Sequence, residues 1–396
     1  MAETPKLTWL GRLVILLFIA GCGYATWLMF IKKPVGQTAT LPADNVAPAS
    51  GGKRVEIGIA YGTEKQRWLQ WAVEEFAKAK EGRDIQINLI PMGSLESAQA
   101  ILAGDQRITV WSPASALYTD VFVQEWTIKN NSNPILREEP LALSPMVFVF
   151  WSERYDAFIA KYSEVSFDTI AQALREPGGW DAIAKKPEWG LYKFGHAHPN
   201  QSNSGLMTLT LLAYEFHKKE RGLELRDILN PQFQAWMNGL ESGVSGLSNS
   251  TGNMMRDMVL RGPSSFDALC VYENVAIDFL ENAKGRWGEL RVAYPKRNMW
   301  SDHPYYILNT PWSNDPQRKA AGRFLDFLLT DAIQRAALNH GFRPGNPSVP
   351  IKFPESPFTL YQKNGLHVEI PSVCESPKAD VINNLLAIWQ RNQGSR

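Results

Sequence analysis

An alternation of short apolar strands with amphipathic helices, beginning at Val55, is the feature that most limits how this chain can fold. The pattern predicts strands over Val55–Ala60, Ile85–Ile90 and Ile108–Trp111, separated by helices over Glu64–Lys80 and Ser94–Leu102. From Trp68 to Phe76, apolar residues recur three and four positions apart, which is the spacing of one buried helical face. Because strands in a β-α-β-α-β order are joined by helical crossovers, we expect a parallel sheet with helices on its faces. The predicted fold class is therefore α/β.

The rest of the chain repeats this pattern and predicts a second sheet. A long apolar strand over Leu143–Trp151 is expected to leave the first unit for the second. The later elements are predicted as helices over Ser166–Arg175, Pro316–Leu329, Asp331–Asn339 and Val381–Arg391, and as strands over Trp189–Phe194, Phe266–Val275, Arg291–Tyr294 and Tyr305–Leu308. A further helix is expected to open from the stretch His198–Gly205, with Ser202, Asn203 and Ser204 just before it, and to run to about His217. We expect one lobe from residues 53–148 and 305–396 and another from 149–304, with crossing strands that allow the cleft between them to close by hinge motion.

The N-terminus contains an apolar segment without charges, Leu13–Ile31. At about 1.5 Å per residue, a helix of this length is close to the roughly 30 Å thickness of the hydrocarbon core of a bilayer. Lys6 and Arg12 precede the segment and two lysines follow it, so charge asymmetry indicates its orientation only weakly. We expect 13–31 to be a single transmembrane anchor, with 1–12 cytoplasmic and the bulk of the chain outside; the alternative is a buried core helix.

A lipobox-like sequence, Ile19-Ala20-Gly21-Cys22, lies inside this segment. It raises the alternative of a cleaved signal with a lipidated Cys22. The sequence stays apolar beyond that cysteine, from Tyr24 to Ile31, which favours an uncleaved anchor. Residues 32–52, rich in Pro, Ala, Gly and Ser, are expected to form a flexible tether.

Charge and cysteine content exclude some classes of function. The 41 Lys and Arg residues balance 40 Asp and Glu residues, for a net charge of +1, and without a basic stripe we expect no nucleic-acid partner. Apart from Cys22 there are only Cys270 and Cys374, and the sequence leaves open whether these two pair or stay free. No metal-knuckle spacing is present.

Polar residues at the carboxyl ends of predicted strands are the candidate ligand contacts, because open α/β sheets bind ligands there. These residues are Thr63, Lys65, Ser112, Ser115, Ser202, Asn203, Ser204, Tyr272 and Glu273. Each has a structural alternative: the hydroxyls and amides can cap helices or turns, Lys65 can be solvated, and Glu273 can stabilise a helix start. A carboxylate at 273 suits a ligand amine or a cation and opposes a purely anionic ligand.

Catalytic and metal-binding patterns are weak. His196 and His198 form an H-x-H pair, and His303 is the only obvious third ligand for a zinc ion, which needs three or four. The sequence has no G-x-S-x-G, H-E-x-x-H or Gly-rich phosphate loop with a lysine. We therefore expect no enzyme activity and no cofactor. A metal-dependent hydrolase that uses His196, His198 and Glu273 is the third-ranked alternative.

Several short motifs occur in an order that resembles a known family. They are Gly62-Thr63-Glu64-Lys65, Val110–Ser115, Gly195–Gly205, Val271–Asn274, His303-Pro304-Tyr305 and Gly341–Pro347. Over about Lys53–Arg391 the chain resembles bacterial extracellular solute-binding proteins of the type II periplasmic-binding fold, and in particular the membrane-tethered branch associated with von Willebrand factor A-type proteins.

The resemblance implies two lobes with parallel or mixed sheets and a crossing-strand hinge, following the transmembrane segment. It also implies a receptor, held on the outer face of the cytoplasmic membrane, that traps a small polar solute for transport or sensing. Its partners would be a membrane permease or a von Willebrand factor A-type protein, and the lipid bilayer around 13–31. A ligandless anchored scaffold with the same fold is the second-ranked alternative, which a cleft filled by bulky residues would favour.

Overall fold

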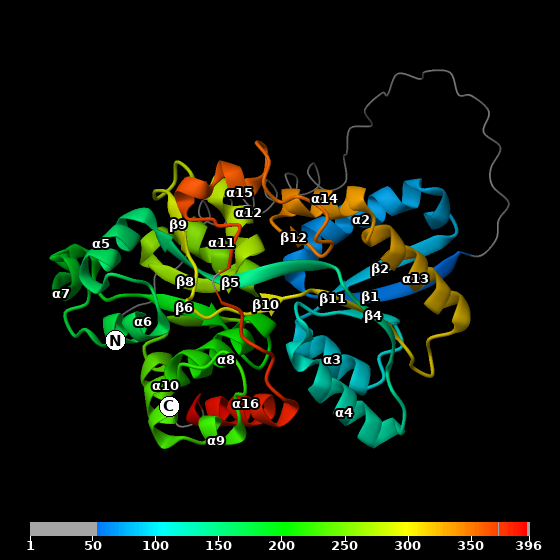
Figure 1. Cartoon of the computed structure of the whole chain (residues 1–396), viewed down its shortest axis with the longest axis horizontal. Helices are drawn as coiled ribbons and strands as arrows, with labels where there is room; N and C mark the ends of the chain where they lie inside the picture. The colour runs from blue at the N-terminus through cyan, green and yellow to red at the C-terminus, as the bar shows by residue number, and fades with distance from the viewer. Residues whose placement is uncertain (1–53, 371, 394–396) are drawn as a thin grey trace, which may run out of the picture. The chain divides into compact units, whose positions relative to one another are not determined.

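The computed structural model describes residues 54–370 and 372–393. Two β-sheets covered by helices make up this part of the chain (Figure 1). The first sheet has the order β2-β1-β3-β11-β4. Its strands are β1 (Val55–Tyr61), β2 (Ile85–Pro91), β3 (Val110–Ser112), β4 (Ile135–Pro140) and β11 (Pro304–Leu308). β1 pairs in parallel with β2 and β3, whereas β11 runs antiparallel to β3 and β4. The predicted parallel β-α-β-α-β unit is thus confirmed, and we call this sheet with its helices the first lobe.

The second sheet has the order β10-β5-β8-β6-β7, and β9 and β12 also pair with β5. Its strands are β5 (Ala142–Trp151), β6 (Phe194–Ala197), β7 (Gly246–Ser248), β8 (Ala268–Tyr272), β9 (Leu290–Ala293), β10 (Trp300–Ser301) and β12 (Arg343–Pro344). β6 is parallel to β7 and β8, and β5 is antiparallel to β8 and β9. We call this sheet with its helices the second lobe, and the mixed pairing agrees with the expected α/β fold.

The strand predicted over Trp189–Phe194 begins later than expected, at Phe194. Residues Pro187–Trp189 form a 3-10 turn that starts with proline, which is favoured at that position. The Trp180 ring makes edge-on contacts with two others: the Trp189 ring at 5.1 Å and the Tyr192 ring at 5.6 Å, measured between ring centroids. Trp180 and Tyr192 are buried and Trp189 is partly buried, so the apolar character of this segment comes from tertiary packing and not from a strand.

Helices cover both faces of each sheet. They are α2 (Gln66–Lys78), α3 (Ser94–Leu102), α4 (Thr119–Asn130), α5 (Ser152–Tyr162), α6 (Phe167–Arg175), α7 (Trp180–Ala184), α8 (Asn203–His217), α9 (Leu225–Ile228), α10 (Pro231–Glu241), α11 (Thr251–Arg261), α12 (Glu273–Ala283), α13 (Asp315–Leu328), α14 (Asp331–Ala337), α15 (Pro357–Leu360) and α16 (Ala379–Gln393). In the first lobe α2 and α13 lie on one face and α3 and α4 on the other; in the second lobe α11 and α12 lie opposite α8 (Figure 1).

The strand β5 joins the lobes, and all but one of its residues are buried. It pairs with β8, β9, β10 and β12 along its length. A strand that is covered on both faces reads as a continuous apolar run, which is why LSPMVFVFW is so easily recognised in the sequence.

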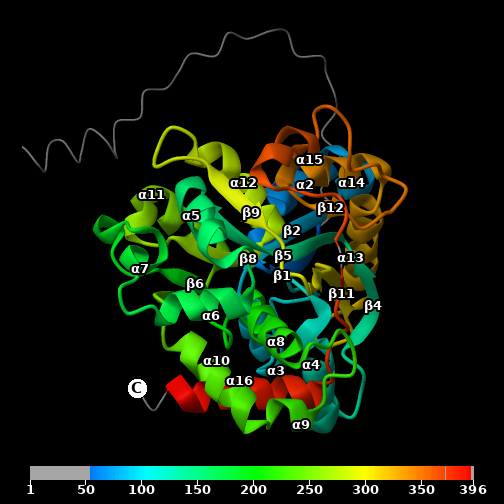
Figure 2. The same cartoon turned by 60° about the vertical axis from the view of Figure 1, so that its left-hand side comes forward.

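The C-terminal helix α16 lies against both lobes. It packs on α8, α9 and α10 of the second lobe and on α4 of the first (Figure 2). The Trp389 indole N–H donates a 2.7 Å hydrogen bond to a Glu241 carboxylate oxygen, and the other carboxylate oxygen lies 2.9 Å from His196 Nε2. Residues 305–396 are therefore not confined to one lobe: α13 and α14 cover the first sheet, but α16 bridges the two.

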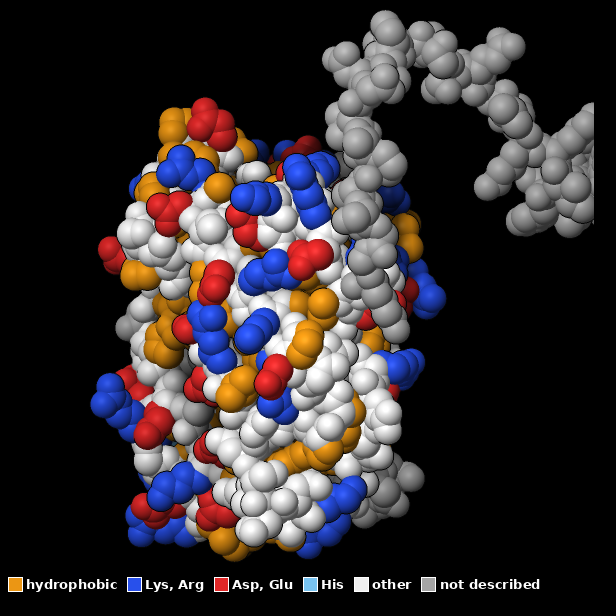
Figure 3. Space-filling view, turned by 90° about the vertical axis from the view of Figure 1, so that its right-hand side faces the viewer, with side chains coloured by type: hydrophobic (Ala, Val, Ile, Leu, Met, Phe, Trp, Pro, Cys, Tyr) orange, Lys and Arg blue, Asp and Glu red, His pale blue; other side chains and the backbone are white. Residues whose placement is uncertain are grey.

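Some predictions concern residues outside the described part of the chain. The anchor at 13–31, Cys22 and the tether at 32–52 all lie there. Among the described residues, none of the helices combines the length and apolar character that a membrane span requires. Cys270 and Cys374 are both free and buried. Lys and Arg side chains are interspersed with Asp and Glu over the face shown in Figure 3, consistent with the balanced charge.

Removal of the Trp389 indole N–H should weaken the attachment of α16. In Trp389→Phe the Glu241 carboxylate loses a donor in a buried site, and we expect the free energy of unfolding to fall by about 2 kcal/mol. Urea titration followed by circular dichroism measures this change. Trp287→Phe is the matched control, because Trp287 is 56% exposed; its effect should be about 0.5 kcal/mol or less. Equal effects of the two substitutions would contradict a bridging role for Trp389.

Candidate functional site

A small cavity of about 10 Å³ lies between the two lobes. Its lining residues come from both sides and are Gly62, Thr63, Glu64, Gly93, Ser94 and Ala114 of the first lobe and Ser202, Asn203, Asn249, Ser250, Thr251 and Tyr272 of the second. This volume is about that of a single water molecule. The structure therefore represents a closed arrangement of the lobes.

Three helices begin at this cavity. Gly93, Ser202 and Ser250 are the N-cap residues of α3, α8 and α11, and the residue after each of them also lines the cavity. The first N–H groups of a helix have no acceptor within the helix, and the helix dipole makes this end electropositive. Each of these helices follows a strand, so the cavity lies at the carboxyl ends of β2, β6 and β7, where α/β folds bind ligands.

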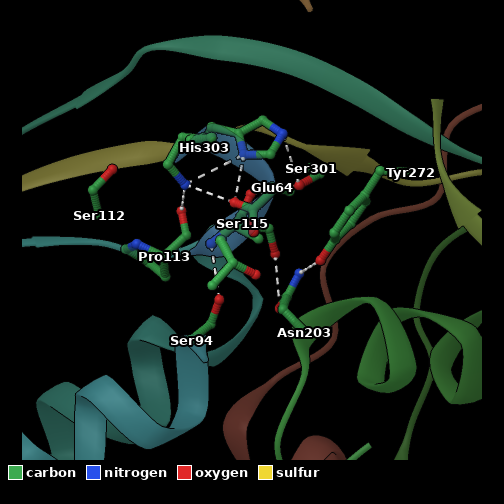
Figure 4. A network of polar contacts seen from close by, with 12 residues as sticks. Glu64, Ser94, Ser112, Pro113, Ser115, Asn203, Tyr272, Ser301 and His303 are labelled. Carbon is green, nitrogen blue, oxygen red and sulfur yellow. Dashed lines mark hydrogen bonds and ion pairs between the residues drawn. The ribbon is translucent and has the colours of Figure 1, made fainter. Parts of the chain in front are cut away.

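Side chains of the two lobes contact each other directly across the cavity. Thr63 Oγ1 lies 3.4 Å from Ser250 Oγ, and the Ser115 hydroxyl donates a 3.2 Å hydrogen bond to Asn203 Oδ1 (Figure 4). The backbones also approach closely, since a Cβ at position 93 would lie only 2.5 Å from the Gln201 carbonyl oxygen. The closed arrangement therefore has its own hydrogen bonds between the lobes.

On the second-lobe side, hydrogen bonds fix the polar groups that face the cavity. The Asn203 amide donates to the Tyr272 hydroxyl at 3.0 Å. The Ser204 hydroxyl lies 2.6 Å from Thr251 Oγ1 and 3.1 Å from Ser202 Oγ, which ties the start of α8 to the start of α11. These side chains are held in place before any ligand arrives, as a binding site requires.

Beneath the first-lobe wall lies a buried charge cluster. Lys65 is fully buried, and its ammonium group donates to Glu64 Oε1 at 2.8 Å and to the Pro113 carbonyl at 2.9 Å (Figure 4). Burial would raise the pKa of the Glu64 carboxyl, but the Lys65 charge and His303 outweigh it and lower this pKa to about 2. Burial lowers the pKa of His303 to about 4. Burial lowers the pKa of Lys65, and the Glu64 carboxylate beside it opposes this shift. The cluster therefore holds the Lys65–Glu64 pair together with an imidazole that is neutral at neutral pH.

Ser301, His303 and Glu64 stand in the order of a serine-hydrolase triad. Ser301 Oγ is 3.3 Å from His303 Nε2, and His303 Nδ1 is 3.4 Å from Glu64 Oε1. The Ser301 hydroxyl, however, donates a hydrogen bond of 2.5 Å to the Ala114 carbonyl and not to His303. Both Ser301 and His303 are fully buried. A nucleophile must be deprotonated by its histidine and reached by a substrate, so this arrangement has a structural role.

Glu273 lies outside the cavity lining, in a second buried ion pair. Its carboxylate accepts bonds of 2.7 and 2.8 Å from the Arg343 guanidinium, and the Tyr294 hydroxyl also donates to it. Arg343 donates in addition to the main-chain carbonyls of His367 and Val368. The pair thus joins the start of α12 to the C-terminal segment.

The structure places four of the nine predicted ligand contacts at the cavity, namely Thr63, Ser202, Asn203 and Tyr272. The other five bond to the protein: Lys65 to Glu64, Ser112 to the Pro304 carbonyl at 2.8 Å, Ser115 to Asn203, Ser204 to Thr251 and Glu273 to Arg343. The sequence reasoning missed Glu64, Ser94 and Asn249–Thr251. Ser94 and Thr251 could have been found from their position, because each begins a helix after a strand.

The three histidines considered as metal ligands belong to separate networks. His196 bonds to Glu241, His198 packs edge-on against the Trp389 ring at 4.9 Å, and His303 lies beside Glu64. Within the described part of the chain, no group of three His, Cys, Asp or Glu side chains is arranged to hold a metal ion. These residues therefore offer no metal centre to a hydrolase built on His196, His198 and Glu273.

Two sheets joined by crossing strands, with a polar cavity at the strand ends, define a two-lobed binding protein. Over residues 57–343 the chain matches the family model described as bacterial extracellular solute-binding protein, and it belongs to that family. It is thus a solute-binding protein, and the description as extracellular places its folded part outside the cytoplasm. No curated protein matches the chain by sequence.

Solved structures share the fold at low sequence identity. The sulfate-binding protein SubI from Mycobacterium tuberculosis H37Rv is 16% identical, covers 87% of this chain and 99% of its own, and superposes with a TM-score of 0.55. A periplasmic thiamin binding protein gives 12% identity, 88% and 99% coverage and a TM-score of 0.59. Iron-bound HitA from Pseudomonas aeruginosa gives 13%, 85% and 99%, and 0.57.

Substitution of Glu273 should affect stability and leave ligand binding unchanged. In Glu273→Ala the buried Arg343 guanidinium loses its counter-ion, and we expect the free energy of unfolding to fall by about 3–5 kcal/mol. Glu281→Ala, on the solvent side of the same helix, is the matched control and should change stability little. Chemical unfolding measures the free energy of unfolding of both variants. A Glu273→Ala protein as stable as the control would show that the Arg343 pair does not hold α12.

A contact between Arg67 and Asp278 also joins the lobes and should make the stability of the protein depend on pH. Arg67 Nη1 of α2 lies 3.2 Å from Asp278 Oδ1 of α12, yet burial raises the pKa of Asp278 to about 6 against the pull of Arg67. A carboxyl with a raised pKa in the folded state stabilises that state at low pH and loses this contribution as pH rises through its folded pKa.

We therefore expect the wild type to lose stability relative to Asp278→Asn as pH rises from about 4 through about 6. Unfolding titrations of both proteins across this range measure the difference. The exposed Asp326→Asn variant is the control and should follow the wild type. A difference that is constant with pH, or that grows in favour of the wild type, would contradict the raised pKa.

Proposed function

We propose that this protein captures a small polar solute between its two lobes and passes it to a membrane permease, or signals its presence. The observation that carries the proposal is the cavity at three helix starts, which is lined by fixed polar groups of both lobes. A ligand bound there would contact both walls at once, and closure by a ligand requires that it bind the closed state better than the open one.

The lining chemistry favours a compact solute that forms hydrogen bonds. The cavity presents hydroxyl groups, amides, main-chain atoms and one acidic residue, Glu64, and in the described part of the chain Tyr272 is the one aromatic residue that lines it. The structural relatives are named for sulfate, thiamin and iron, so the fold alone does not select a ligand. With room for about one water in the closed arrangement, the lobes must separate to admit a solute and close less completely around it.

Location and partners form part of the same proposal. The uncharged segment 13–31 would anchor the chain in the cytoplasmic membrane, with residues 32–52 as a tether and the lobes on the outer side. A tethered receptor of this kind would deliver its solute to an ABC-type permease in the same membrane. A von Willebrand factor A-type protein is the alternative partner.

A ligandless scaffold is the second candidate, and the small cavity favours it. The cleft is filled by small polar side chains that bond to each other across the lobes, such as Thr63 with Ser250 and Ser115 with Asn203. A protein that no longer binds a solute can retain such contacts as a permanent lobe interface.

A thermal-shift screen of the chain, stripped of bound ligand by unfolding and refolding, separates the two candidates. The panel holds oxyanions, amino acids, sugars, polyamines and divalent metals. A solute at 100 times its dissociation constant adds about 2.7 kcal/mol to stability, which raises the midpoint by several degrees. We expect a shift confined to one chemical class.

Asn203→Ala removes an amide that lines the cavity. We expect it to weaken the affinity for the solute by about tenfold or more, and so to reduce the thermal shift. Asn130→Ala, on the exposed end of α4, should leave it intact. Silence across the panel from a refolded protein would favour the scaffold, and an unchanged shift in Asn203→Ala would place the ligand elsewhere.

A further inference from the structure

Glu64 is the one charged residue among those that line the interlobe cavity in the described part of the chain. Its side chain is only 7% exposed. Both carboxylate oxygens lie 2.4 Å from the position that a Cβ on residue 62 would occupy, so a side chain at 62 would require the Glu64 carboxylate to shift. Glycine at 62 therefore accommodates the observed position of this carboxylate.

The cavity that Glu64 lines has further features that would suit an anionic ligand. The N-terminal residues of α3, α8 and α11, which are 9, 15 and 11 residues long, line the same cavity. Helix starts of this kind favour negative charge through their free N–H groups and dipoles. On the other side, the Lys65 ammonium group lies 2.8 Å from Glu64 Oε1.

The carboxylate also acts across the cavity. Burial, and after it the Glu64 charge, raises the pKa of the Tyr272 hydroxyl on the opposite wall. The Glu64 main-chain carbonyl accepts a hydrogen bond of 3.4 Å from the Asn274 amide of the second lobe. Glu64 thus interacts with the second lobe through its charge and through its backbone.

We infer that the Glu64 carboxylate occupies the anion position of the cleft, so that the lobes close without an anionic solute and oxyanions are excluded. The inference rests on the proposed function and deepens it, because it makes Glu64 a specificity-determining residue. An oxyanion that entered the closed cleft would face a buried carboxylate, and the Lys65 ammonium group beside that carboxylate is already paired with it. The solute that the wild type admits is therefore neutral or positively charged, with hydrogen-bond donors that the Glu64 carboxylate can accept.

Chemical rescue tests this assignment in the full chain. Glu64→Ala removes the carboxylate and leaves Lys65 buried without a counter-ion, and formate or acetate can then take the vacated position. We expect acetate to raise the unfolding midpoint of Glu64→Ala by about 2 °C or more, whereas chloride at equal ionic strength does not. The wild type and the control Glu75→Ala, on the exposed face of α2, should show no such gain.

The double variant Glu64→Ala/Lys65→Met should lose the rescue, because no buried ammonium group remains to hold the added anion. If Glu64→Ala does not fold in anion-free buffer, its refolding yield with acetate against chloride gives the same comparison. Rescue that is absent from Glu64→Ala, or that persists in the double variant, would overturn the assignment.

A measurement on the wild type alone provides an independent test. Equilibrium dialysis with radiolabelled sulfate should detect no binding at the cavity. Sulfate binding to the wild type that is lost in Asn203→Ala would overturn the exclusion of oxyanions. The outcome is separable from that of the proposed function. If acetate rescues Glu64→Ala but no neutral or cationic solute stabilises the wild type, the receptor proposal fails and the role of Glu64 stands.

Discussion

The burial of the Lys65 ammonium group is the interaction on which the closed cleft depends. A charge taken out of water needs a partner and further hydrogen bonds, or the fold loses several kcal/mol. Glu64 and the Pro113 carbonyl supply them, and His303 completes the cluster from the segment that leads from β10 into β11. By meeting this requirement, the first strand–helix turn fixes a carboxylate at the boundary between the lobes.

The lobes are also joined by contacts that need no solute. The contacts between the lobes, from Thr63–Ser250 to Arg67–Asp278, are made by the chain itself. The helix α16 adds a bridge outside the cleft, since it packs on α4 as well as on α8 to α10. A solute that enters the cleft must therefore displace hydrogen bonds between the lobes. This favours a ligand whose donors and acceptors replace those of the displaced side chains.

The sequence predicts those parts of the fold that periodic burial determines. β2 and α3 begin and end within a residue of their predicted limits, because alternation and helical spacing report directly on which face is covered. The same periodicity placed the start of β6 too early, because Tyr192 is buried and Trp189 partly buried by tertiary packing. The sequence reasoning also identified Thr63 and Lys65 but not Glu64 between them, because spacing along a turn does not say which side chain faces the cavity. The partner of Glu273 could not be predicted, since Arg343 is 70 residues away in sequence.

The most direct test of this account is the distance between the lobes in solution without any solute. Spin labels on the full chain at Lys78→Cys of α2 and Lys284→Cys after α12, in a Cys22→Ser background, report it by pulsed dipolar spectroscopy. If Glu64 holds the lobes closed without a solute, the wild type shows a single short distance that oxyanions do not change. Glu64→Ala then shows a broader and longer distribution, and acetate returns it to the short distance. A wild type that is open in the absence of solute and closes when an oxyanion is added would contradict this account.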